Sequence, residues 1–349
     1  MPQGHKHTRM FFRVQHKAHS GACNGDDPLH DKHRRRHEKP KQPAPLQRMW
    51  KVRKTLSAIP ADSQTAEKNG QIHGAFAAAL DNRACQTYND KIDHGGHMTV
   101  FYFTGTGNSL AVAKRIGGTL VSIPQAVDSD NLHYKDDAIG VVFPIYWWTL
   151  PKMVRRFLDR VKFETDYTFA IGTYGSLPGA AMLNLQKRAR KNGCRFDYAN
   201  HLLMLDNYLP VFEMGAQVKK LPNKKVEEKT AKIVNDVNNR KHMQATASLG
   251  LRVISAITGA ARNPTGKNTK KYIVNSQCNK CSTCAKVCPS GNITVTDRVC
   301  FADKCEVCFA CLHLCPQSAM HHKSQKSDKR WINPEVSLNE IIKANNRVT

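Results

Sequence analysis

The sequence predicts an α/β chain in which a doubly wound parallel sheet is followed by a small, cysteine-rich α+β module. From Met98 onward, short apolar runs alternate with helical patterns, which is typical of parallel strands joined by crossover helices. The nearly continuous apolar run 139–143 indicates a strand covered on both faces. Cysteines then gather between residues 278 and 315 in two runs of the same pattern, which indicates an internal repeat.

Residues 1–97 show no legible fold. They hold 10 of the 16 histidines and basic clusters such as Arg34–Arg36, without sustained periodicity, so we expect a disordered, basic, histidine-rich extension. The abrupt change at Met98 leaves open that the functional protein starts there. A metal-binding histidine arm also stays open, although the histidines lack a ligand-like repeat.

The predicted sheet domain covers residues 98–215. Its strands and helices are expected in pairs, at Thr99–Phe103 with Leu110–Ile116, Ala138–Phe143 with Lys152–Val161, and Thr168–Gly172 with Ala180–Arg190, before a last strand within Phe196–Leu205. Residues 216–270 are mostly polar and basic and predict a connector with one or two solvated helices. The cysteine-rich domain is then expected at 271–325, followed by a C-terminal tail at 326–349.

The chain is strongly basic, with 53 lysines and arginines against 28 acidic residues and a formal net charge of +25. Such a charge attracts acidic partners, nucleic acid or anionic lipid. No helix-turn-helix or RNA-binding signature accompanies it, so we expect a solvated basic surface that meets acidic redox partner proteins, and no specific nucleic acid.

No membrane span is expected, because three glycines and one proline interrupt the longest uncharged stretch, 167–186. The start of the chain has no secretion signal, and we therefore expect a cytoplasmic protein. The oligomeric state is not indicated.

The two cysteine runs follow the pattern C-x2-C-x2-C-x3-C-P and lie 27 residues apart. They are Cys278, Cys281, Cys284 and Cys288 before Pro289, and Cys305, Cys308, Cys311 and Cys315 before Pro316. Three thiolates at this spacing can bind three irons of a 4Fe-4S cluster, while the fourth serves the cluster of the other run. We therefore expect one cluster on Cys278, Cys281, Cys284 and Cys315, and the other on Cys305, Cys308, Cys311 and Cys288.

Two other metal sites compete with this interpretation. Structural zinc also uses paired C-x2-C units, but it does not explain two fourth cysteines that are each followed by proline. Cys300, Cys305 and Cys308 match the plant-type 2Fe-2S spacing, but that choice leaves Cys311 and Cys315 without a role. With the eight cysteines in place, residues 272–322 resemble a bacterial two-cluster ferredoxin, which implies low-potential, one-electron transfer.

A hydroxyl-rich loop follows the first predicted strand and opens a helix. It consists of Thr104, Gly105, Thr106, Gly107, Asn108 and Ser109. Its hydroxyls and backbone amides can surround a phosphate, and the helix N-terminus favours the negative charge. The loop lacks the lysine of a P-loop, and Leu110 replaces the third glycine of a dinucleotide-binding motif. Neither ATP nor a dinucleotide is therefore the expected ligand.

Two more loops follow the next strands of the predicted sheet, at the edge where open parallel sheets bind ligands. The candidate binding residues there are Pro144, Tyr146, Trp147, Thr173, Tyr174 and Gly175. The aromatic rings can sandwich an isoalloxazine ring. Core packing or a lid role explains any single ring equally well.

The hydroxyl-rich loop resembles the T-x-T-G-x-[ST] phosphate loop of flavodoxins, which holds FMN without a basic side chain. Residues 98 to about 325 together resemble the EFR-type ferredoxins, in which a flavodoxin-like domain precedes a two-cluster ferredoxin. The resemblance is carried by Phe101–Ser109, Phe143–Trp148, Thr173–Gly179, Asn207–Pro210 and both cysteine runs. It implies FMN and two 4Fe-4S clusters in one polypeptide, and we expect a flavin and iron-sulfur oxidoreductase. No catalytic acid, base or nucleophile stands out, so an electron carrier without its own substrate and an iron-sulfur redox sensor remain alternatives.

Overall fold

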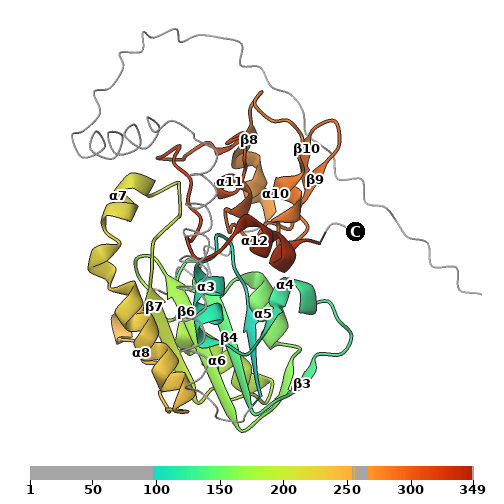
Figure 1. The fold of residues 1–349 in the computed structure, drawn as a ribbon. Coiled ribbons are helices and arrows are strands. Elements are labelled where there is room, and N and C mark those ends of the chain that lie inside the picture. Colours follow the sequence, from blue (N-terminus) through green and yellow to red (C-terminus); the bar gives the residue numbers. More distant parts are fainter. Residues whose placement is uncertain (1–96, 254, 256–265, 348–349) are drawn as a thin grey trace, which may run out of the picture. The chain divides into compact units, whose positions relative to one another are not determined.

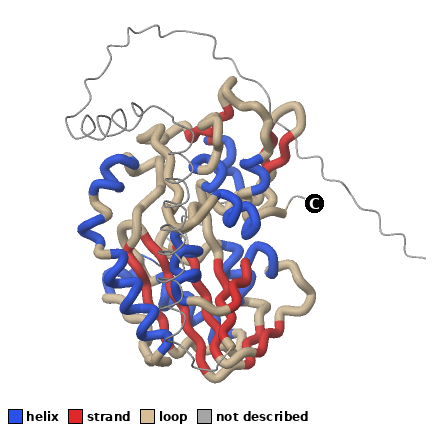
Figure 2. The backbone as a smooth tube through the Cα atoms, in the orientation of Figure 1, coloured by secondary structure: helices blue, strands red, loops and turns tan. Residues whose placement is uncertain are grey.

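The computed structural model describes residues 97–253, 255 and 266–347. The expected extension at 1–97 therefore lies outside the described residues, except for His97. Part of the expected connector, residues 254 and 256–265, also lies outside them. The described residues contain a five-stranded parallel sheet (Figures 1 and 2). Its strands, in spatial order, are β2 (Thr119–Ser122), β1 (Met98–Tyr102), β4 (Ala138–Pro144), β6 (Tyr167–Tyr174) and β7 (Tyr198–Leu203).

Counted along the chain, these five strands have the order 2-1-3-4-5, which is the flavodoxin-like doubly wound arrangement. The predicted α/β fold class is thus confirmed for this part of the chain. A separate pair of short parallel strands, β3 (His133–Lys135) and β5 (Lys162–Glu164), lies outside the five-stranded sheet.

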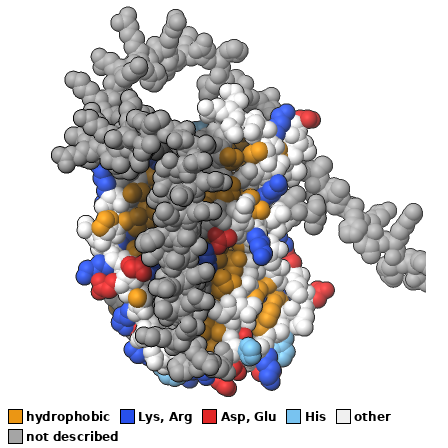
Figure 3. Space-filling model, in the orientation of Figure 1, with side chains coloured by type: hydrophobic (Ala, Val, Ile, Leu, Met, Phe, Trp, Pro, Cys, Tyr) orange, Lys and Arg blue, Asp and Glu red, His pale blue; other side chains and the backbone are white. Residues whose placement is uncertain are grey.

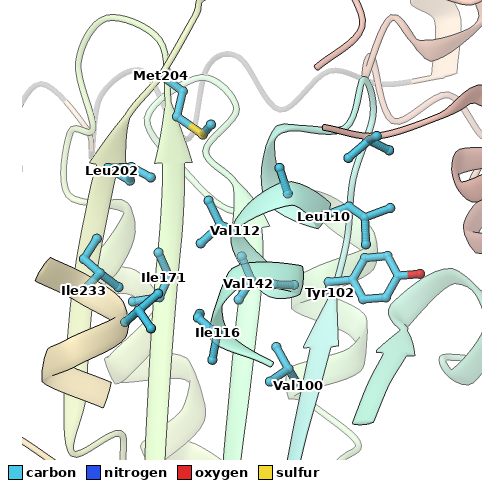
Figure 4. Packing of buried hydrophobic residues seen from close by; sticks show 14 of the residues in the cluster. Val100, Tyr102, Leu110, Val112, Ile116, Val142, Ile171, Leu202, Met204 and Ile233 are labelled. Carbon is cyan, nitrogen blue, oxygen red and sulfur yellow. The ribbon is translucent and has the colours of Figure 1, made fainter. Parts of the chain in front are cut away.

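Two apolar cores lie on opposite faces of the sheet. Successive residues of β1 alternate between them: Val100 and Tyr102 belong to one cluster, and Phe101 belongs to the other. This period of two is that of a strand buried on both faces. Figure 4 shows the first core, in which α3 (Asn108–Ile116) covers the strands. The second core is covered by α4 (Ile123–Ala126), α5 (Lys152–Leu158) and α6 (Ala181–Lys191).

Helices occupy part of the predicted connector: α7 (Met214–Lys219), a 3-10 turn at Pro222–Lys224 and α8 (Val226–Asn238). The expectation that they are solvated is wrong for one face of α8. Ile233, Val234 and Val237 are buried in the first core, and α8 contacts α3 and β7. These three apolar residues have helical spacing, but the surrounding lysines conceal the stripe in the sequence.

The cysteine-rich module repeats its backbone after 27 residues. Strand β8 (Tyr272–Val274), helix α10 (Thr283–Lys286) and strand β9 (Ile293–Val295) are followed by β10 (Val299–Phe301), α11 (Ala310–His313) and β11 (Met320–His322). Left-handed backbone conformations recur at the same offset, at Lys280 and Val307, Ser282 and Phe309, and Gly291 and Ser318. The two halves pair with each other through antiparallel strands. Strand β8 of the first half pairs with β11 of the second half, and β9 of the first half pairs with β10 of the second half. The repeat in the sequence is therefore also a repeat in the structure.

The predicted C-terminal tail contains a helix, α12 (Leu338–Asn345). Ser337 and Glu340 form a capping box at its start. The helix packs against α4 of the sheet domain and α10 of the cysteine-rich module (Figure 1). The C-terminal segment therefore joins the two parts.

The surface shown in Figure 3 carries lysines and arginines spread among acidic side chains rather than gathered in one patch. Among the described residues, no helix has both the length and the apolar character needed to cross a membrane.

Candidate functional site

A cavity of about 350 Å³ lies at the carboxyl ends of β1, β4 and β6, the edge that the sequence predicts. Of the twelve residues predicted to bind the flavin, all except Gly107 line it: Thr104, Gly105, Thr106, Asn108, Ser109, Pro144, Tyr146, Trp147, Thr173, Tyr174 and Gly175. The structure thus brings loops separated by up to about 70 residues to one place. We call this space the large cavity.

The hydroxyl-rich loop forms one wall of the large cavity. The side chains of Thr104, Thr106 and Ser109 are buried. The Thr104 hydroxyl accepts a hydrogen bond from the Gly107 amide at 3.1 Å, and the hydroxyls of Ser109 and Thr173 lie 2.9 Å apart. No side chain caps the N-terminus of α3. Its first amide groups are therefore left for an anion.

Aromatic residues of the loop after β4 form a second wall. Tyr146 and Thr149 pair through two backbone hydrogen bonds of 3.0 Å, and the turn between them holds Trp147 and Trp148 at φ 52° and 61°. Bulky residues in this left-handed region cost on the order of 1–3 kcal/mol each. The Trp147 ring lies edge-on to Tyr208 with centroids 4.9 Å apart. Such strain is typical of ligand-binding loops.

The loop after β7 also lines the large cavity, with Leu205, Asp206, Asn207, Tyr208, Val211 and Phe212, none of which is among the predicted site residues. Lys224 is buried and donates hydrogen bonds to the carbonyls of Gly175, at 2.8 Å, and Met204. Burial lowers the pKa of Lys224. This lysine ties two of the strand-end loops together. In the sequence it is one lysine in a basic stretch, and no pattern marks it.

The C-terminal segment 331–345, which we call the C-terminal strap, contacts the hydroxyl-rich loop at Asn333. The Asn333 amide donates a hydrogen bond to the carbonyl of Thr106 at 2.9 Å. Its side chain donates to the Asn108 side chain at 3.1 Å. Gly107 lies against the same segment, because a Cβ there would be 3.0 Å from the Cβ atoms of Asn333 and Val336.

Asn345 lies at the end of the C-terminal strap and is completely buried. Its side-chain amide donates hydrogen bonds to the carbonyls of Thr104, at 3.0 Å, and Val287, at 3.3 Å. Its Oδ1 atom has no hydrogen-bond partner. Because Val287 precedes Cys288, this side chain connects the hydroxyl-rich loop directly to the cysteine-rich module.

Two smaller cavities lie within the cysteine-rich module, and each is lined by four cysteines. The first cysteine group is Cys278, Cys281, Cys284 and Cys315. The second cysteine group is Cys288, Cys305, Cys308 and Cys311. Each group contains the fourth cysteine of the other run, as the sequence predicts. Within the described ranges, no three histidine, cysteine or acidic side chains converge closely enough to hold a single metal ion.

Backbone amides and burial shape the environment of the thiols. Three backbone amides donate hydrogen bonds to cysteine sulfur atoms, each with an N···S distance of 3.3 Å. The donors are Asn292 to Cys288, Ala319 to Cys315 and Val307 to Cys305. Such contacts tune the sulfur ligands of metal centres. Burial, assisted by neighbouring cysteines, raises the pKa of the Cys284 thiol to about 11. The same causes raise the pKa of Cys308 well above its ordinary value.

Cys308 lines both the large cavity and the cavity of the second cysteine group. A Cβ atom on Gly105 would lie 2.8 Å from the Cys308 carbonyl oxygen and 3.0 Å from the Tyr146 hydroxyl. Only glycine therefore permits this approach of the hydroxyl-rich loop to the cysteine. Burial, and then the charge of Cys308, raise the pKa of Tyr146 well above its ordinary value, so its phenol stays protonated.

Two buried side chains hold the cysteine-rich module against the sheet domain. Glu306 accepts a hydrogen bond of 2.9 Å from the amide of Lys152, the first residue of α5. His313 donates from Nε2 to the Asn207 carbonyl at 2.8 Å and accepts at Nδ1 from the Trp331 amide at 3.1 Å. Burial lowers the pKa of His313 to about 4, consistent with the neutral ring that this pair of bonds requires.

Comparisons with known proteins find distant matches among solved structures. No family model matches the chain, and no curated protein matches it. Among solved structures, a Megasphaera elsdenii flavodoxin is 18% identical with a TM-score of 0.23, over 30% of this chain and 84% of that one. An NAD(P)H:quinone oxidoreductase from Methanothermobacter marburgensis is 11% identical with a TM-score of 0.26, over 44% of this chain and 99% of that one. Scores this low carry no inference about a ligand, and the flavodoxin-like fold rests on the strand order.

Proposed function

We propose that this protein transfers electrons between FMN, bound in the large cavity, and two 4Fe-4S clusters, bound by the two cysteine groups. The observation that carries the proposal is the position of Cys308, which belongs to the wall of the large cavity and to the second cysteine group. The protein would thus act as a flavin and iron-sulfur oxidoreductase, with a two-cluster ferredoxin module at residues 271–325.

The size and the chemistry of the large cavity suit FMN. Its volume falls within the range of small-molecule sites, and it lies where open parallel sheets bind ligands. The buried hydroxyls and free amides at the start of α3 suit a phosphate, and no lysine or arginine is among the described residues that line the cavity. The aromatic residues near Trp147 suit a flat ring. FMN would supply the exchange of electrons singly or in pairs.

The two cysteine groups fit 4Fe-4S clusters better than they fit zinc. A zinc ion draws its four ligands around one point, and the described residues contain no such converging set. A 4Fe-4S cluster instead binds one thiolate at each of four separate irons. The plant-type 2Fe-2S alternative is not favoured either, because Cys300 lines neither cysteine cavity.

The protein's own residues bring the two kinds of cofactor close together and limit the access of water. Gly105 allows the Cys308 loop to approach the hydroxyl-rich loop. Tyr272 and Phe309 are almost fully buried beside the second cysteine group. Tyr146 keeps its proton and lines the large cavity, where it can donate a hydrogen bond. With both cofactors bound, Cys308 would lie between the second cysteine group and the large cavity, because it lines both.

Cofactor analysis of the full chain, purified and reconstituted without oxygen, tests the proposal. We expect about eight irons per chain, as two 4Fe-4S clusters require, one FMN, and the absorbance and EPR spectra of both cofactor types. Stoichiometric zinc with no iron, or a protein that does not bind FMN, would overturn the proposal. Turnover with a small organic acceptor would then distinguish an enzyme from a carrier that serves only protein partners.

A further inference from the structure

We propose that an acidic electron-carrier protein docks on the surface around the first cysteine group, and that electrons enter the protein there. This inference rests on the proposed function and adds the entry point and the chemistry of the partner. The docking surface consists of five side chains: Asn279, Lys280, Cys281, Lys286 and Gln317.

The two cysteine groups differ in their access to solvent. In the first group Cys281 is exposed, and so are Asn279, Lys280 and Gln317, which line the same cavity. The cavity of the second group is enclosed: Asn292 and Phe309, which line it, are each 3% exposed. Electron transfer between proteins falls steeply with distance. A partner that docks on the surface therefore reaches the first cluster before the second.

The two halves of the module also differ in charge, although they share one backbone. Residues 275–296, around the first run, contain Lys280 and Lys286 and no acidic residue. The equivalent segment 302–323 contains two acidic and two lysine residues, so its charges cancel. Both Lys280 and Lys286 are exposed, and neither takes part in an ion pair among the described residues.

The position of these two lysines favours a carrier protein as the partner. Lys280 lies between Cys278 and Cys281 in the chain and has a left-handed backbone. Lys286 is the last residue of α10, the four-residue helix that begins two positions after Cys281. Charges beside an exposed redox centre steer an oppositely charged partner to that centre. An acidic protein with its own redox group meets both requirements, whereas nucleic acid supplies no electron.

The test uses the reconstituted full chain and a paired charge-reversal variant, Lys280→Glu with Lys286→Glu. Its matched control is Lys187→Glu with Lys191→Glu, which makes the same charge change on exposed residues of α6. Iron and FMN content are measured first for all three proteins. Stopped-flow absorbance then follows reduction by a prereduced acidic 2Fe-2S ferredoxin at about 0.02 M and 0.5 M salt, and by photoreduced deazaflavin as a small reductant.

At low salt we expect the docking variant to be reduced by the ferredoxin at least about tenfold more slowly than wild type. The control should stay within about twofold of wild type. At 0.5 M salt the rates should converge, because the charges are screened, and reduction by deazaflavin should be equal in all three. Equal ferredoxin rates at low salt would overturn the docking surface while the cofactors remain. So would equal slowing in the control, or slowing that persists with deazaflavin. Absence of iron or FMN from the wild-type protein would instead overturn the proposed function, and the docking surface with it.

Discussion

Replacing Asn345 by alanine should weaken both the fold and the proposed binding of FMN in the large cavity, because this side chain joins the hydroxyl-rich loop to the cysteine-rich module. The substitution removes two hydrogen bonds and leaves the buried carbonyls of Thr104 and Val287 without this donor. An unsatisfied buried polar group costs about 1–3 kcal/mol. The substitution also removes the unpartnered Oδ1 atom, which offsets about one such cost. The net loss of unfolding free energy should therefore be about 1–3 kcal/mol.

The matched control for Asn345→Ala is Asn339→Ala, because Asn339 lies on the same helix and is exposed. Surface substitutions of this kind usually change stability by less than about 0.5 kcal/mol. Urea unfolding of the reconstituted proteins measures the difference in stability, and titration of the flavin-free proteins with FMN measures affinity. If the whole loss of about 1–3 kcal/mol reduced the free energy of FMN binding, FMN would bind about 5- to 150-fold more weakly. Stability and FMN affinity of Asn345→Ala that match those of Asn339→Ala would refute the linking role of this side chain.

Three further perturbations address the cysteine groups, the hydroxyl-rich loop and the acid stability of the C-terminal strap. Cys288→Ala should damage the cluster of the second cysteine group and spare the first, and EPR spectra that show the reverse would contradict cross-ligation. Bulky leucines in place of Thr106 and Ser109 should expel FMN and leave iron near about eight per chain, measured by flavin fluorescence and iron analysis. A hydrogen bond from Lys114 lowers the pKa of Glu340 from 4.5 to about 2. The resulting stabilisation is complete above pH 4.5 and is lost as pH falls toward 2, so Lys114→Met should flatten this part of the pH–stability curve.

The sequence predicts the hydroxyl-rich loop and three of the four members of each cysteine group well, because these residues are close together in the chain. Cys278, Cys281 and Cys284 have a spacing that only a few metal centres use, and Thr104–Ser109 is a continuous loop between a strand and a helix. Local spacing of this kind survives in any tertiary arrangement. It therefore predicts which residues come together, and the ligands that they would bind belong to the proposed function.

Other parts of the site could not be predicted, because they depend on contacts between distant segments. Asn345 meets Thr104 across 241 positions of the chain. Lys224 meets the Gly175 carbonyl across 49 positions. A lone asparagine or lysine in a polar stretch carries no periodicity and no motif. Asn345 acquires its role only when α12 packs against α4 and α10. Lys224 acquires its role only when the segment before α8 packs against the strand ends.

The repeat in the cysteine-rich module separates what the backbone determines from what the surroundings determine. Val307 and Lys280 occupy the same left-handed position of the loop, 27 residues apart. Val307 is buried and lines the large cavity, whereas Lys280 is exposed to solvent. The same loop can therefore present three thiols in either half. The side chain between the thiols matches what lies beside each half, which is the large cavity for Val307 and the solvent for Lys280. An exchange of the two residues tests this division of roles: Val307→Lys should reduce FMN affinity and leave the iron content unchanged, because it places a charge in an apolar wall, whereas Lys280→Val should leave both unchanged.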